Sequence, residues 1–178
     1  LQEAADLDQG FELIEDAEEA LEVISLDHKK EPIKITVTGE IYTLIEPAAN
    51  QNLEELLMMM GCEVQRRVTV SWWLTRSFHF LPSRQKYMPH EIGGFAKETV
   101  EEILQSQTDG TIKIMPSGCM PEIVSKAVCN KIAEREGHKI LHLIYDEMQG
   151  KAGYETRVEA FVDMLERSRH VLSGDRRR

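Results

Sequence analysis

Cysteine is scarce in this 178-residue chain, and its scarcity limits the kinds of site that the chain can build. The three cysteines are Cys62, Cys119 and Cys129, and no two of them form a Cys-x-x-Cys pair. An odd count without a secretory signal argues against a disulfide framework and indicates a reducing, cytoplasmic compartment. Three thiols also fall short of the four that an iron–sulfur cluster or a structural zinc site usually takes.

Several other signals are missing, and each absence excludes a class of function. No apolar run approaches the roughly 20 residues that span a bilayer. No phosphate-binding loop and no Ser-His-Asp motif occurs, which argues against an intrinsic ATPase or a triad hydrolase. The net charge of -10 disfavours nucleic acid and anionic membranes as partners, because both repel it. The chain begins with Leu1 rather than Met, so we expect an N-terminal domain of the same protein to be missing.

What is present is one amphipathic helical pattern followed by four strand-and-helix pairs. We predict an N-terminal helix and hinge over residues 1–32, an α/β domain over 33–172, and a disordered tail over 173–178. The predicted strands are 33–38, 62–68, 111–115 and 139–145, and the predicted helices are 8–24, 51–60, 90–107, 121–136 and 154–169. This alternation predicts an open, mostly parallel flavodoxin/Rossmann-like sheet of strand order 2-1-3-4, with helices on both faces.

Such a sheet binds ligands at the carboxyl ends of its strands, at the point where the strand order reverses. Here that point lies between the first and third strands, so the loops at 40–50 and 116–121 are expected to face each other. Polar or reactive residues near this edge are Glu40, Tyr42, Glu46, Cys119, Asp146 and Glu147. Glu40, Tyr42 and Asp146 are our candidate catalytic residues, although acidic residues at strand ends serve equally often as helix caps.

Cys119 is the most informative residue at this edge, because it precedes a predicted helix. The N–H groups and the dipole of a helix N-terminus favour a thiolate, which is the metal-binding and nucleophilic form of cysteine. Position alone leaves three interpretations open: a cluster ligand, a reactive thiol, or a small residue in a turn.

Residues 69–89 form a second unusual stretch, in which aromatic and basic residues alternate. It contains Trp72, Trp73, Phe78, Phe80 and Tyr87 beside Arg76, Arg84 and Lys86. Such a stretch can pack on a sheet, present a surface to a partner or a coenzyme, or bind nucleic acid. The acidic net charge makes nucleic acid the weakest of these interpretations.

Three separated motifs resemble one bacterial family, the activase-related relatives of 2-hydroxyacyl-CoA dehydratases, also labelled CoA-substrate-specific enzyme activases or CoA protein activases. The resemblance covers about residues 33–165. The motifs, in order, are Gly39-Glu40-Ile41-Tyr42 with Glu46-Pro47-Ala48-Ala49-Asn50, then Cys119-Met120-Pro121-Glu122-Ile123-Val124, then Asp146-Glu147 with Gly150, Ala152, Gly153 and Thr156 to Asp163.

The resemblance implies the C-terminal flavodoxin-like domain of an iron–sulfur accessory or electron-transfer protein. In such relatives a 4Fe–4S or double-cubane cluster lies between two domains, and an ATP-hydrolysing activase supplies electrons. Cys119 would be a cluster ligand, and the other thiolates would come from the missing domain. Within the motifs or beside them, Gly39, Glu46, Gly118 and Pro121 are our candidate cofactor-binding residues. The expected partners are that domain and an ATP-dependent activase, with a dimer also possible. The alternative is a non-catalytic domain that docks the activase.

Overall fold

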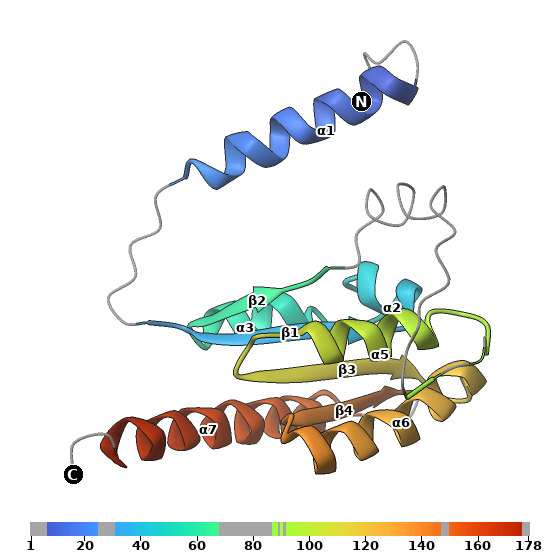
Figure 1. Ribbon diagram of the computed structural model, residues 1–178. Coiled ribbons are helices and arrows are strands. Elements are labelled where there is room, and N and C mark those ends of the chain that lie inside the picture. Colours follow the sequence, from blue (N-terminus) through green and yellow to red (C-terminus); the bar gives the residue numbers. More distant parts are fainter. Residues whose placement is uncertain are drawn as a thin grey trace. The chain divides into compact units, whose positions relative to one another are not determined.

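The computed structural model describes residues 7–24, 31–67, 87–88, 90, 92–146 and 150–175 (Figure 1). The chain divides into two compact units, one of Leu1–Glu31 with Thr69–Leu81 and one of Pro32–Val68 with Pro82–Arg178. In the first unit, helix α1 spans Leu7–Glu22, close to the predicted 8–24. Our interpretation of α1 as a docking helix stays a prediction, and most of the aromatic and basic stretch lies outside the described residues.

The second unit is built on a parallel four-stranded sheet of order β2-β1-β3-β4, as predicted. Its strands are β1 (Ile33–Gly39), β2 (Cys62–Gln65), β3 (Gly110–Pro116) and β4 (Ile140–Tyr145). β1 and β3 form the centre, with Val37 opposite Ile112. The strand order therefore reverses between them, where the sequence predicts it.

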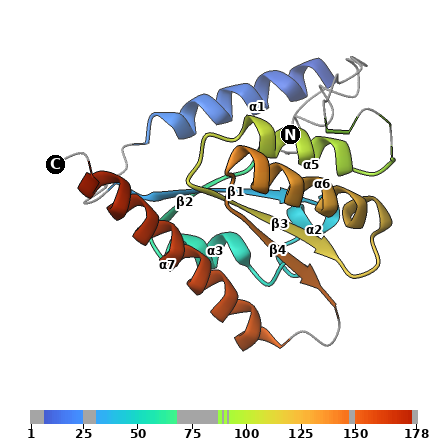
Figure 2. The ribbon, with the colours of Figure 1, turned by 60° about the horizontal axis from the view of Figure 1, so that its bottom comes forward.

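Helices cover both faces of this sheet (Figure 2). They are α2 (Ile41–Ile45), α3 (Leu53–Met59), α5 (Ala96–Gln105), α6 (Met120–Glu136) and α7 (Lys151–Asp175). α5 and α6 pack on one face, and α3 and α7 on the other (Figure 2). Together with the strand order, this arrangement confirms the predicted α/β class.

The two faces of the central strands differ in character. Toward α7 the strands present the buried side chains of Ile35, Val37 and Ile112, and a Cβ added to Gly110 would lie 2.8 Å from Leu165. Toward α5 and α6 the same strands present Thr36, Thr38 and Lys113, all buried. A separate apolar cluster fills the space between these two helices, formed by Met88, Ala96, Val100, Ile103, Cys129 and Ile132.

Several predicted boundaries are wrong. The predicted loop at 40–50 contains α2, which forms because the Glu40 side chain caps it. β2 ends at Gln65, α5 begins at Ala96, and α7 extends to Asp175, which includes the first residues of the predicted tail. Within the described residues, none of the helices combines the length and the apolar composition needed to cross a membrane.

Candidate functional site at the carboxyl edge of the sheet

Cys119 lies where β3 ends and α6 begins, and it is the N-cap residue of α6. A tight turn leads to it, with Gly118 at a φ of +82° and the Cys119 N–H donating to the Pro116 carbonyl at 3.4 Å. The Ser117 N–H donates to the Tyr145 carbonyl at 2.7 Å, which ties this turn to β4. The Cys119 side chain makes no capping hydrogen bond to the helix, and the residue is partly exposed. It is therefore available to a group outside the helix.

The end of β1 lies beside this turn and is closely packed. Gly39 has a φ of +142°, and an added Cβ would lie 1.8 Å from the Ile114 carbonyl oxygen, so only glycine fits. The Glu40 N–H donates to the same oxygen at 3.1 Å. The Glu40 carboxylate accepts hydrogen bonds from the N–H groups of Tyr42 and Thr43 at 3.0 and 2.8 Å. These hydrogen bonds cap α2 and give Glu40 a structural role, which weakens the case that it is a catalytic base.

Asn50 holds the loop that follows α2. Its amide donates to the Thr43 carbonyl at 2.9 Å and its side-chain oxygen accepts from the Leu53 N–H at 3.1 Å. Its main-chain carbonyl accepts from the hydroxyls of both Tyr145 and Tyr154, each at 3.1 Å. Burial raises the pKa of both phenols, that of Tyr154 to about 12, so both remain donors at neutral pH. These hydrogen bonds join the loop after α2 to β4 and α7.

A fully buried ion pair lies beneath the first turn of α6. The Lys113 ammonium contacts the Glu122 carboxylate at 2.6 Å, and both side chains are at most 1% exposed. Lys113 also donates to the Glu122 carbonyl at 3.1 Å. The carboxylate further accepts from the hydroxyls of Ser125 at 2.9 Å and Thr99 at 3.3 Å. The pair therefore ties β3, α5 and the first turn of α6 together directly below Cys119.

A second buried carboxyl, that of Glu102 on α5, occupies the neighbouring position. It accepts from the Thr38 hydroxyl at 2.5 Å and from the Arg67 N–H at 2.9 Å. Burial raises its pKa, although these hydrogen bonds and the charges of Arg67 and Arg66 oppose that shift. Because Thr38 and Lys113 are paired across β1 and β3, the polar groups of both helices meet at adjacent positions on the sheet.

The loop before α5 also reaches the first turn of α6. Gly94 has a φ of +58°, and a Cβ added there would lie 3.2 Å from the ring of Pro121. Because Gly94 has no side chain, the backbone of this loop can pack closely against Pro121. This contact gives Pro121 a packing role beside its candidate role in cofactor binding.

Three of the remaining predicted residues lie on α2, directly after α2 and directly after β4. Glu46 is exposed and accepts from the Ala48 N–H at 3.2 Å. Asp146 follows β4 and is exposed, and Glu147 lies outside the described residues. Tyr42 is 65% exposed on α2.

The other two cysteines lie away from Cys119. Cys62 begins β2, at the amino edge of the sheet, and Cys129 is buried in α6, where burial raises its pKa to about 12. No group of three or more His, Cys, Asp or Glu side chains within the described part of the chain could hold a metal ion. One thiol at the edge does not fit a whole cluster, so these residues could supply only part of one.

The sequence analysis missed Lys113 and Glu102 as members of a polar network. Lys113 lies in an apolar run and Glu102 in a helical pattern, so neither stood out. The one available signal was a lysine in a central strand, where a charged side chain requires a partner.

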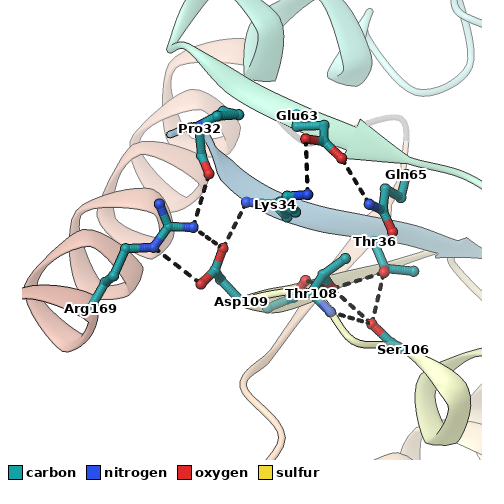
Figure 3. Close-up of polar contacts among 10 residues, drawn as sticks. Pro32, Lys34, Thr36, Glu63, Gln65, Ser106, Thr108, Asp109 and Arg169 are labelled. Carbon is teal, nitrogen blue, oxygen red and sulfur yellow. Dashed lines mark hydrogen bonds and ion pairs between the residues drawn. The ribbon is translucent and has the colours of Figure 1, made fainter. Parts of the chain in front are cut away.

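At the opposite edge of the sheet, Asp109 and Arg169 join α7 to the start of β1 (Figure 3). The Asp109 carboxylate accepts from the Lys34 N–H at 2.8 Å and from Arg169 at 2.5 Å, and Arg169 also donates to the Pro32 carbonyl. These contacts give Asp109 and Arg169 a structural role, which is to hold α7 against the start of β1.

With this geometry established, the chain was compared with known proteins. Neither the models of known protein families nor the curated proteins give a match. The function proposed below therefore depends on the site and on the motif resemblance.

Proposed function

We propose that this chain is a domain of an iron–sulfur accessory or electron-transfer protein related to the 2-hydroxyacyl-CoA dehydratase components. In this role it supplies one thiolate, that of Cys119, to a centre whose other ligands come from another domain or subunit. The observation that carries the proposal is the position of Cys119, partly exposed at the N-terminus of α6 and without a capping hydrogen bond.

The surroundings of Cys119 support a contact with another protein part. Met120 and Ile123, on the first turn of α6, are 66% and 44% exposed, and Tyr42 on α2, which packs against β1 and β3, is 65% exposed. Large apolar side chains that gather at an exposed edge are typical of an interaction surface. A thiolate beside such a surface could complete a site when the other part docks.

Anaerobic reconstitution with ferrous iron and sulfide tests the proposal. A small monothiol in excess would stand in for the ligands that this chain does not supply. Unbound reagents are removed by gel filtration before the spectrum is recorded, because iron, sulfide and monothiol absorb without the protein. We expect visible thiolate-to-iron absorption for the wild-type protein and its loss in Cys119→Ser, because serine removes the thiolate. Cys62→Ala is the matched control and should retain the absorption. Absorption that survives in Cys119→Ser would show that Cys119 is not a ligand.

The second candidate is a non-catalytic domain that docks an ATP-dependent activase, and the same exposed apolar side chains favour it. It differs from the first in one testable respect, since binding would depend on the surface and not on the thiol. We expect Met120→Asp to weaken binding of a purified activase while Cys119→Ser leaves it unchanged. The reverse pattern would exclude this candidate.

A further inference from the structure

A second polar site lies away from Cys119, between the carboxyl end of β2 and the last turns of α5. A cleft of about 630 Å³ opens there. We name it the β2–α5 cleft, and its lining consists of Thr36, Val64, Gln65, Arg66, Arg67, Glu102, Gln105, Ser106 and Gln107. Apart from Val64, all of these residues are polar or charged, whereas most ligand pockets are largely apolar with a few polar groups. The cleft therefore suits a small polar molecule.

Buried groups fix the position of Arg67 in this cleft. Its main-chain N–H donates to Glu102 at 2.9 Å, and Glu102 is itself held by the Thr38 hydroxyl at 2.5 Å. Glu102 is only 4% exposed. The backbone at Arg67 is thus fixed although its side chain is exposed.

The guanidinium of Arg67 retains most of its hydrogen-bonding capacity. A guanidinium carries five N–H donors. Among the described residues its one hydrogen-bond partner is the neutral side-chain oxygen of Gln105, and none of them forms an ion pair with it. The two oxygens of Glu102 already accept from Thr38 and from the Arg67 main chain.

The other cations near the cleft among the described residues are paired with carboxylates. Arg66 also lines the cleft, but its guanidinium contacts Glu54 at 3.3 Å and the Leu44 carbonyl at 3.2 Å, so its charge is already paired. Lys34 pairs with Glu63 at 3.5 Å. Arg67 is accordingly the cation that the cleft offers to a ligand.

Hydroxyl groups form one wall of the cleft. Thr36 on β1 and Ser106 in the loop after α5 line the cleft, and both contact the hydroxyl of Thr108 behind them; the three hydroxyls are 2.7 to 2.9 Å apart (Figure 3). Gln65 lies beside them and donates to Glu63 at 2.8 Å (Figure 3). Each hydroxyl has one proton, and Thr108 donates its proton to the Gly110 carbonyl at 3.0 Å, so a ligand oxygen would take the proton of Thr36 or Ser106 in place of a bond within the cluster.

We propose that the β2–α5 cleft binds a small oxyanion, a carboxylate or a phosphate, through the Arg67 guanidinium. The planar guanidinium holds such groups by two parallel hydrogen bonds. This site is independent of Cys119 and of the proposed iron–sulfur role. It lies over the edge strand β2, away from the point between β1 and β3 where the strand order reverses.

Titrations of the whole chain with sodium acetate and with inorganic phosphate test the proposal. NMR signals of Arg67, Thr36 and Ser106 are followed at constant ionic strength, with sodium chloride as the matched salt, because screening alone changes surface signals. We expect saturable shifts with at least one of the two anions and none with chloride. A stronger effect of acetate would identify a carboxylate site, and a stronger effect of phosphate a phosphate site.

Three variants establish whether Arg67 is responsible. Arg67→Gln should weaken binding by about tenfold or more, and Arg67→Lys should weaken it less, because an ammonium keeps the charge without the paired geometry. Arg157→Gln is the matched control. It removes the same charge at the far edge, where Arg157 donates to the His142 carbonyl, and should leave binding unchanged. Absence of saturable shifts with both anions, or equal binding by Arg67→Gln and the wild type, would overturn the proposal.

Discussion

The buried Lys113–Glu122 pair gives the sharpest prediction about stability. Lys113→Met keeps an unbranched side chain of similar length but removes the ammonium. The Glu122 carboxylate would remain buried with only the hydroxyls of Ser125 and Thr99 as donors. Removing one partner of a buried pair typically lowers the free energy of unfolding by about 3–5 kcal/mol. Since both side chains are at most 1% exposed, solvent cannot compensate, and we expect a loss in this range.

The double variant Lys113→Met with Glu122→Gln separates charge burial from packing. It removes both charges and keeps an acceptor and a donor for the two hydroxyls. Replacing a buried ion pair with well-packed hydrophobic residues of similar volume is often close to neutral, and the double variant likewise leaves no buried charge. We therefore expect the double variant to regain most of the lost stability.

Urea denaturation followed by circular dichroism measures both variants, with the free energy of unfolding obtained by linear extrapolation. The matched control is Lys34→Met, which removes a lysine from the exposed pair with Glu63 and should change stability by less than about 1 kcal/mol. A loss below about 1 kcal/mol in Lys113→Met would refute the reasoning. A double variant as unstable as the single variant would do the same.

Three further predictions concern the sheet edge and its pH response. Gly39→Ala should lower the unfolding free energy by at least about 3 kcal/mol, because the new Cβ would lie 1.8 Å from the Ile114 carbonyl oxygen. A loss under about 1 kcal/mol in urea denaturation would contradict this prediction. Asn50→Ala should lower it by about 2–3 kcal/mol, since two buried main-chain groups lose their partners; thermal unfolding at an unchanged midpoint would disprove it. His142 has its pKa lowered to about 4, by burial first and then by nearby cations including Lys113, so the unfolded chain takes up a proton that the folded chain does not. Stability should therefore fall as the pH decreases from about 7 to about 4, and His142→Gln should flatten that slope in urea denaturation; an unchanged slope would exclude this cause.

The strand order and the position of Cys119 could be predicted because they depend on local pattern. The β-branched run of β1 and the turn at Gly118 mark where strands begin and end, and the short connections allow few topologies. Pro121 and Glu122 likewise mark the start of α6. These features require only residues that are neighbours in the sequence.

The polar layer beneath α5 and α6 could not be predicted in the same way. Lys113 and Glu122 are nine positions apart, and Thr38 and Glu102 are separated by 64. Their pairing depends on how helices cross the sheet, which periodicity does not specify. Glu40 illustrates a further limit, because a carboxylate after a strand has the same sequence pattern as a helix cap and as a catalytic base. Only its hydrogen bonds to Tyr42 and Thr43 distinguish the two.

The most direct test of the Cys119 assignment is protection of its thiol from alkylation. The protein is reconstituted anaerobically with iron, sulfide and a small monothiol, excess monothiol is removed, and the product is treated briefly with iodoacetamide. Mass spectrometry then measures alkylation at each cysteine, with the unreconstituted protein as the reference. We predict that Cys119 is alkylated in the reference and protected after reconstitution, because a metal-bound thiolate is not free to react. Equal alkylation of Cys119 in both samples would contradict the account.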